Sequence, residues 1–208
     1  MPAPSGRTPA PRDGRSVVGG EGDVRVVLPA ALHVVAGAGG GDEVAHDAAA
    51  APVSGMLRGL VAGEPGTRLE LAALGSLDDG LGGRAHFTLS LATFEGTLPD
   101  VAALRAAGTP DARAVALPCG PAVVVTSWAG VALPGLDDTL LGRFDVHVQH
   151  ARPGLVLLLS IATTGVHVWD AASELAATVA CSLEFGSFAA PAGAGAAGNR
   201  AGTAGPTR

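Results

Sequence analysis

The chain has 208 residues, of which 48% are hydrophobic and 15% charged, and its formal net charge is −6 at pH 7. This length suits a single domain with its own core, and the composition is that of a folded protein rather than a charge-rich disordered one. The negative net charge and the scattered arginines argue against the clustered basic surface that nucleic-acid binding needs, so no nucleic-acid partner is expected.

Residue usage indicates the source and the redox compartment. Arginine supplies all 13 of the lysine or arginine positions, and tyrosine is absent. Such usage is typical of a GC-rich genome and indicates a bacterial, actinobacterial source. The two cysteines, Cys119 and Cys181, are too few for a disulfide framework or a cysteine-rich zinc site. Reduced thiols in a cytoplasmic protein are therefore expected.

The two ends of the chain differ from its middle. Residues 1–22 mix Pro, Gly, Ser and Arg without apolar periodicity, and residues 187–208 are rich in Ala and Gly. Such segments bury too little apolar surface to offset the entropy lost on ordering. The sequence therefore predicts disordered tails at 1–22 and 187–208, around a single domain at 23–186.

The apolar stretch "VVLPAALHVVAG" at Val26–Gly37 is the segment that most resembles a targeting signal. A bilayer span needs about 20 residues, so no membrane span is expected. A signal peptide carries its charged region near its start, whereas here the preceding segment is long and contains Glu21 and Asp23. Folded structure is expected, and whether the stretch is a strand or part of a signal segment stays open.

Helices and alternating strands succeed one another along the chain. Residues 42–63 have helical character, but Pro52 and Gly55 interrupt it, so either two short helices or one beginning near Pro52 is expected. Apolar and polar residues then alternate in "RLELAAL" (68–74) and "HFTLSLATF" (86–94), which predicts two strands with one wet and one packed face. A short helix is expected from about Leu98 to Ala107.

The last third contains about four consecutive strands and a closing helix. "RFDVHVQH" (143–150) alternates, and "GLVLLLSIATTG" (154–165) is apolar on both faces, which indicates a central strand. From Asp170 to Leu183 an apolar stripe recurs at helical spacing, and Asp170 is placed to cap the first turn. The predicted fold is α+β: a two-layer sandwich with an antiparallel sheet, helices on one face, and the last helix across the packed face.

The stretch "ALPCGPAVVV" (116–125) holds the residue that looks most like chemistry, Cys119. A catalytic cysteine needs a lowered pKa and a base within hydrogen-bond reach. Strand rather than helix comes after Cys119, and Gly120 and Pro121 have the backbone preferences of a turn, so a structural turn is expected. The alternative is a small cysteine-dependent enzyme that pairs Cys119 with His147 or His150.

The glycine-rich run "VVAGAGGGDEV" (34–44) has some features of a dinucleotide-binding turn. Gly37 and Gly39 fit the first two places of G-x-G-x-x-G, but Asp42 occupies the third, where its carboxylate would repel a pyrophosphate. A flexible loop is expected. A nucleotide-binding protein that uses the Gly37–Gly41 loop remains a second alternative.

The six histidines do not form an obvious metal site. Asp145 and His147 should share one face of a strand, with His150 on the other, so a chelating pair needs a distant third ligand. Solvated strand-face residues are expected instead. Cys181 should lie away from the apolar stripe of the last helix as an exposed, unpaired thiol. No catalytic, cofactor-binding or metal-binding residue is assigned, and no cofactor is expected.

Three segments carry a resemblance to a known class. These are "ARAVALPCGPAVVV", "FDVHVQHARPGLVLLLSIATTG" and "DAASELAATVACSLEF", which together span about Arg113 to Phe185. They resemble uncharacterised actinobacterial proteins of the PsbP-like α/β-sandwich class. The resemblance implies a non-catalytic binding or accessory module, with a secretion-chaperone-like role among some relatives, and it carries over no catalytic residue. We expect a binding domain that takes a protein or small ligand through its sheet face or loops.

Overall fold

The computed structural model describes residues 14–19, 23–30, 32–37, 66–78, 83–131 and 139–186. The expected helical segment at 42–63 lies outside these residues, as do residues 1–13 and 187–208 of the predicted tails. The described residues include two antiparallel sheets and the predicted closing helix.

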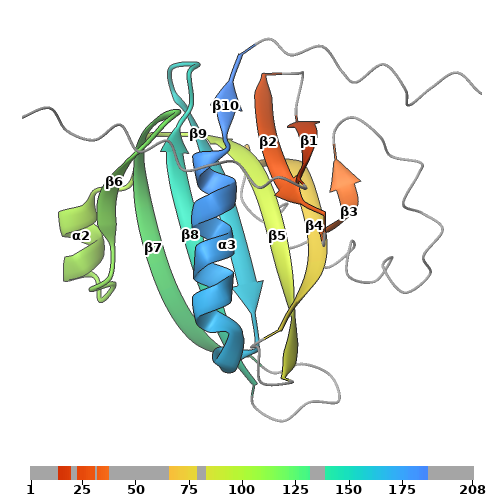
Figure 1. The fold of residues 1–208 in the computed structure, drawn as a ribbon. Coiled ribbons are helices and arrows are strands. Elements are labelled where there is room, and N and C mark those ends of the chain that lie inside the picture. Colours follow the sequence, from red (N-terminus) through yellow and green to blue (C-terminus); the bar gives the residue numbers. More distant parts are fainter. Residues whose placement is uncertain are drawn as a thin grey trace, which may run out of the picture.

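An antiparallel sheet of seven strands forms the larger layer (Figure 1). Its spatial order is β3 (His33–Gly37), β4 (Arg68–Asp78), β5 (Arg84–Glu95), β9 (Leu155–Thr163), β8 (Thr139–Gln149), β7 (Gly120–Val131) and β6 (Arg113–Leu117). Every neighbouring pair is antiparallel. The predicted antiparallel sheet is confirmed, and β9, whose apolar run indicated a central strand, is the middle strand of the seven.

A second, three-stranded sheet has the order β1 (Gly14–Gly19), β2 (Val24–Pro29) and β10 (Glu184–Phe185). The stretch Val26–Gly37 therefore contributes to two strands, β2 and β3, rather than one. Predicting a tail was wrong for Gly14–Gly19, whose backbone pairs antiparallel with β2 from Gly14↔Pro29 to Gly19↔Val24. This six-residue strand has glycine at both ends and little apolar alternation, so its sequence alone does not indicate a strand. Its backbone is held by hydrogen bonds to the neighbouring strand β2.

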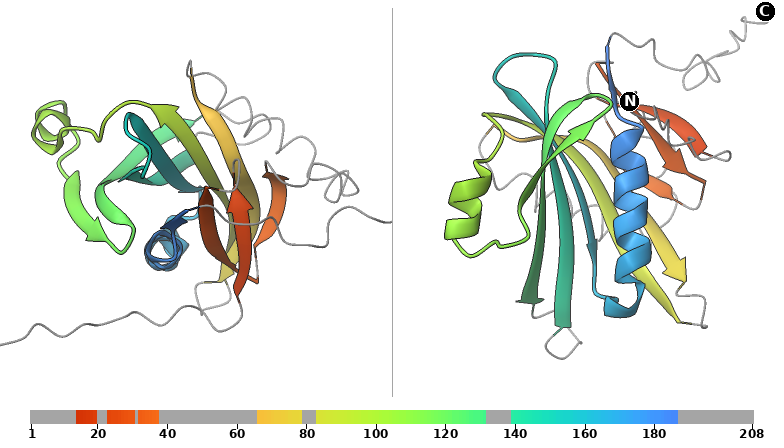
Figure 2. Two further views of the ribbon diagram at one scale, coloured as in Figure 1. Left: turned by 90° about the horizontal axis from the view of Figure 1, so that it is seen from above. Right: turned by 60° about the vertical axis from the view of Figure 1, so that its left-hand side comes forward.

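Helix α3 (Trp169–Cys181) lies across the concave face of the larger sheet, as the view from above in Figure 2 shows. The turn η1 (Val166–Val168) leads into it. Ala172, Ala176 and Val179 of the predicted stripe are buried against the sheet, which confirms the two-layer α+β sandwich. Asp170 does not cap the helix: Val168 is the N-cap residue and makes no side-chain hydrogen bond, because the preceding 3₁₀ turn moves the helix start to Trp169.

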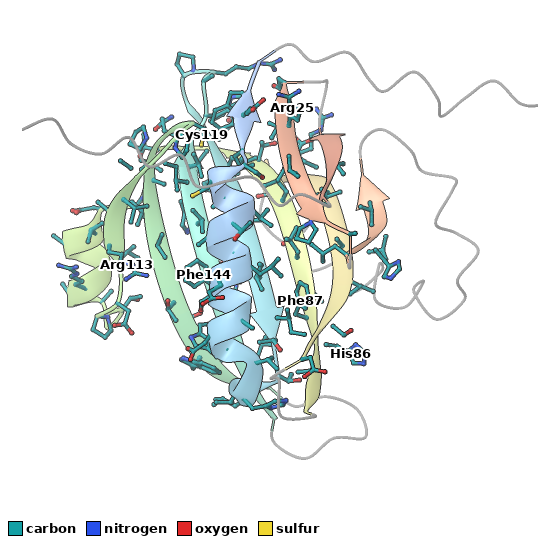
Figure 3. The ribbon with its side chains drawn as sticks, viewed as in Figure 1. Arg25, His86, Phe87, Arg113, Cys119 and Phe144 are labelled. Atoms are coloured by element: carbon teal, nitrogen blue, oxygen red, sulfur yellow. The ribbon has the colours of Figure 1, made fainter. Side chains whose placement is uncertain are left out.

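The hydrophobic core fills the space between α3 and the two sheets. Its sheet side chains alternate along each strand, as Leu89 and Leu91 do on β5 and Leu157 and Leu159 on β9. Figure 3 shows Phe87 and Phe144 on the two sides of α3. Burying each such side chain stabilises the fold by about 1.5–3 kcal/mol.

The short helix α2 (Val101–Ala106) begins later than predicted, because Asp100 is its N-cap and accepts a hydrogen bond from the Ala102 N–H at 2.9 Å. None of its residues is buried, and it lies beside β6 rather than on the packed face (Figure 1). Of the helices in the part of the chain that the structure describes, none is long and apolar enough to cross a membrane.

Candidate functional site

A pocket of about 200 Å³ lies where strand ends of the two sheets meet. Its lining comes from four segments: the start of β4, the end of β5, the residues after β8, and Asp23 just before β2. We call it the seam pocket. Its polar side chains are Asp23, Arg68, Glu70, Thr93, Glu95, His150 and Arg152.

A β-bulge on β4 turns Glu70 toward the seam pocket. Leu69 pairs with Ala92 and Leu71 with Leu91, so Glu70 is the extra residue between them. The alternation in "RLELAAL" predicted Glu70 on the wet face, and that prediction was wrong, because the bulge interrupts the period of two. Glu70 is only 3% exposed.

One oxygen of the Glu70 carboxylate is bonded and the other is not. The Thr93 hydroxyl donates to Oε1 at 2.7 Å, and the Arg68 Nε lies 3.5 Å from the same oxygen. Oε2 is buried without a hydrogen-bond partner among the described residues. An unsatisfied buried acceptor lowers the free energy of unfolding by about 1–3 kcal/mol. Such atoms are rare in folded proteins, so this oxygen is a candidate to accept a hydrogen bond from a ligand.

His150 supplies a complementary unsatisfied atom. It is 4% exposed, and the Arg152 backbone N–H donates to its Nδ1 at 2.9 Å. In the neutral ring the proton therefore sits on Nε2. Nε2 lies 3.7 Å from Asp23 Oδ2, beyond hydrogen-bond distance, and is buried without a partner among the described residues.

Burial keeps the His150 ring neutral near pH 7. It lowers the pKa of His150 below the ordinary 6.5, and the Arg152 charge adds to that effect. The carboxylates of Asp23 and Glu70 act in the opposite direction without overcoming it. The lining residues of the seam pocket therefore include an N–H donor, His150, and a carboxylate acceptor, Glu70.

The pocket also carries an excess of negative charge. Three carboxylates of its described lining face two guanidiniums, with a neutral histidine. Arg152 Nη2 lies 3.1 Å from Asp23 Oδ2, and Arg68 pairs with Glu70, so each guanidinium already has a carboxylate beside it. The arrangement favours a ligand that donates hydrogen bonds.

Cys119 lies in a turn, as predicted. Leu117 pairs with Gly120 across the β6–β7 hairpin, and Gly120 has φ of 145°. Burial raises the pKa of the Cys119 thiol, the Cys181 thiol adds to the rise, and a backbone hydrogen bond opposes it. Within the described ranges, no hydrogen bond joins Cys119 to His147 or His150. A thiol with a raised pKa is a weak nucleophile at neutral pH.

Cys181 was expected to be exposed, and that prediction was wrong, because it is half-buried. The β6–β7 turn lies beside the end of α3, as the position of Cys119 in Figure 3 shows. The electrostatic effect of Cys181 on the Cys119 thiol agrees with this proximity.

The other candidates from the sequence lie apart from the seam pocket. Asp145 and His147 share the face of β8 turned away from α3, and His150 lies on the opposite side, as predicted. Asp145 accepts a hydrogen bond from the Arg143 Nε at 2.8 Å. Burial lowers the pKa of His147, whose ring meets the Phe94 ring edge to face at 6.3 Å between centroids.

The remaining candidates from the sequence are a metal site and the Gly37–Gly41 loop. Among the residues that the structure describes, no group of three or more His, Cys, Asp or Glu side chains is arranged to hold a metal ion. Gly37 ends β3 opposite Leu71, and the rest of the Gly37–Gly41 loop lies outside the described residues.

Sequence reasoning missed the seam pocket. Asp23, Glu70 and His150 are far apart along the chain, and Glu70 fits the alternation around it, so no local signal marked it. The described elements define an α+β protein with a helix-covered antiparallel sheet and a polar pocket at the seam with a smaller sheet. No protein-family model matches this chain, and no curated protein matches it.

Proposed function

We propose that this protein is a non-catalytic binding module and that a small polar ligand occupies the seam pocket. The observation that carries the proposal is the pair of buried, unsatisfied polar atoms, Glu70 Oε2 and His150 Nε2, in the lining of one cavity. Proteins leave few buried polar atoms unsatisfied, and a donor and an acceptor in the lining of one cavity can together orient a ligand.

Binding fits the chemistry of this pocket better than catalysis. The hydroxyl of Thr93 already donates to Glu70, and the described lining contains no cysteine or serine. Outside the pocket, the best candidate nucleophile among the described residues is Cys119, and burial raises the pKa of its thiol. A covalent mechanism needs an activated nucleophile beside a base, so these groups favour holding a ligand over reacting with it.

The resemblance to the PsbP-like class supports the same kind of role. On that ground we extend the proposal to an accessory module of actinobacterial origin that works beside a partner protein, as secretion chaperones do. The half-buried free thiols of Cys119 and Cys181 favour a reducing compartment, so the proposed location is the cytoplasm.

Protein-observed NMR with a library of small polar compounds of mixed charge tests the proposal. We expect compounds that shift the signals of Glu70, Thr93 and His150, saturate, and are recovered unchanged. Hits confined to other surfaces, or no hits at all, would overturn the proposal. If the protein converts a compound to product, and Glu70→Gln abolishes that reaction, the protein is an enzyme and not a binding module.

A further inference from the structure

We propose that the ligand of the seam pocket is a small organic cation with an oxygen acceptor next to its charged N–H group, an amino alcohol being the simplest example. This inference rests on the proposed function and adds the ligand's chemical class. The pocket's charge, the hydrogen-bonding chemistry of two unsatisfied atoms in its lining residues and its size all support it.

The charge balance selects a cation over an anion. Asp23, Glu70 and Glu95 face only Arg68 and Arg152, so the described lining carries one excess negative charge while His150 is neutral. An anion would compete with carboxylates that already lie against both guanidiniums. It would also lie close to the carboxylate of Glu70, a lining residue, and like charges in a partly buried site repel strongly.

The two unsatisfied atoms select the ligand's functional groups. Glu70 Oε2 can only accept a hydrogen bond, so the ligand must supply a donor. A charged N–H group gives a shorter and stronger hydrogen bond to a carboxylate than a neutral donor does. His150 Nε2 can only donate, because the Arg152 N–H occupies Nδ1 and fixes the tautomer. The ligand therefore needs an oxygen acceptor beside its cationic donor.

The size of the pocket limits the ligand to a small one. About 200 Å³ is below the roughly 300–1,000 Å³ of sites for drug-sized molecules. Phe94 contributes to the lining, but its ring packs against His147 on the other side of the sheet.

Four probes of similar size test the class near neutral pH, by NMR titration of the full chain. Ethanolamine has both groups, propylamine only the cation, ethylene glycol only the oxygens, and glycolate a negative charge. We expect ethanolamine to shift the Glu70 and His150 signals with a Kd at least about tenfold lower than that of the other three.

Two variants separate the two contacts. Glu70→Gln should remove the protein's preference for ethanolamine over ethylene glycol. His150→Phe, which keeps a ring against Phe185, should remove the protein's preference for ethanolamine over propylamine. Glu174→Gln, on the exposed side of α3, is the matched control and should change neither preference. If a variant does not fold, the order of the four probes on the wild-type chain still decides the question.

The outcomes distinguish the ligand class from the proposed function. Glycolate or ethylene glycol binding at the pocket as tightly as ethanolamine would overturn the class and leave the binding function standing. Failure of all four probes, while other library compounds bind there, would also overturn the class alone. If no compound of any kind binds at the pocket, both proposals fail.

Discussion

Glu70 and Thr93 form a part-buried hydrogen bond that leaves the other carboxylate oxygen, Oε2, buried and unbonded, and this oxygen costs stability at the seam pocket. Removing one partner of a buried polar pair leaves the other unsatisfied, whereas replacing both by apolar groups of similar shape can be neutral or stabilising. Binding sites commonly trade stability for function in this way.

The first prediction comes from this pair. Thr93→Val should lower the free energy of unfolding by about 1 kcal/mol, because Glu70 Oε1 loses its closest donor. The double variant Glu70→Leu with Thr93→Val should be at least as stable as the wild type. Urea unfolding of the three proteins measures both effects, and a double variant less stable than Thr93→Val alone would contradict the argument.

Cys119 gives the second prediction at the residue scale. Since burial raises the pKa of its thiol, a thiol reagent should modify it more slowly than a free cysteine peptide at neutral pH. Urea should abolish the protection. The single variants Cys119→Ser and Cys181→Ser assign the rates to each thiol. Rapid modification of native Cys119 would favour the cysteine-enzyme alternative.

At the scale of elements, Ser182 ties the end of α3 to the smaller sheet. The Val27 N–H donates to Ser182 Oγ at 3.0 Å, and the Ser182 hydroxyl donates to the Val179 carbonyl at 2.7 Å. This side chain therefore links a helix and a strand that are far apart in sequence.

The third prediction concerns this link. Ser182→Ala should lower the free energy of unfolding by about 1–2 kcal/mol, because the Val27 N–H loses its acceptor. Hydrogen exchange at Val27 should also become faster. Thr178→Ala is a matched control, since its hydroxyl bonds only to the Glu174 carbonyl within the helix. Equal effects of the two variants would argue against a link between α3 and β2.

Elements were predicted well where their own side chains decide the structure. The alternating strands and the stripe of α3 depend on which residues avoid water, and they need no knowledge of the partners. Glu70 and Asp170 fail for a different reason. A bulge on β4 changes the register at Glu70, and a 3₁₀ turn before α3 moves the cap from Asp170 to Val168; each change depends on what the neighbouring element allows.

For the whole molecule, the buried His150 and the half-buried His147 predict how stability depends on pH. Burial lowers the pKa values of His147 and His150 in the folded chain below the ordinary 6.5. The unfolded chain then binds more protons than the folded chain as pH falls through 6.5. The free energy of unfolding should therefore decrease as pH falls from neutral to about 5.

Urea unfolding at several pH values measures this fourth prediction. His150→Phe should flatten the decrease between neutral pH and about 5, since one of the two proton-linked groups is removed. His86→Gln, at an exposed position on β5, is the control and should leave the slope as it is. An unchanged slope in His150→Phe would mean that His150 is not buried in its neutral form.

The sequence by itself determined the class of fold: the antiparallel sheet, the middle strand β9, the turn at Cys119 and the packed face of α3. Each of these depends on local periodicity or on backbone preferences of a few adjacent residues. Only the tertiary structure decided the pairing of Gly14–Gly19 with β2 and the meeting of Asp23, Glu70 and His150 at the seam. These contacts join segments far apart in the chain, and the free energy of such a contact depends on the partner rather than on the local sequence.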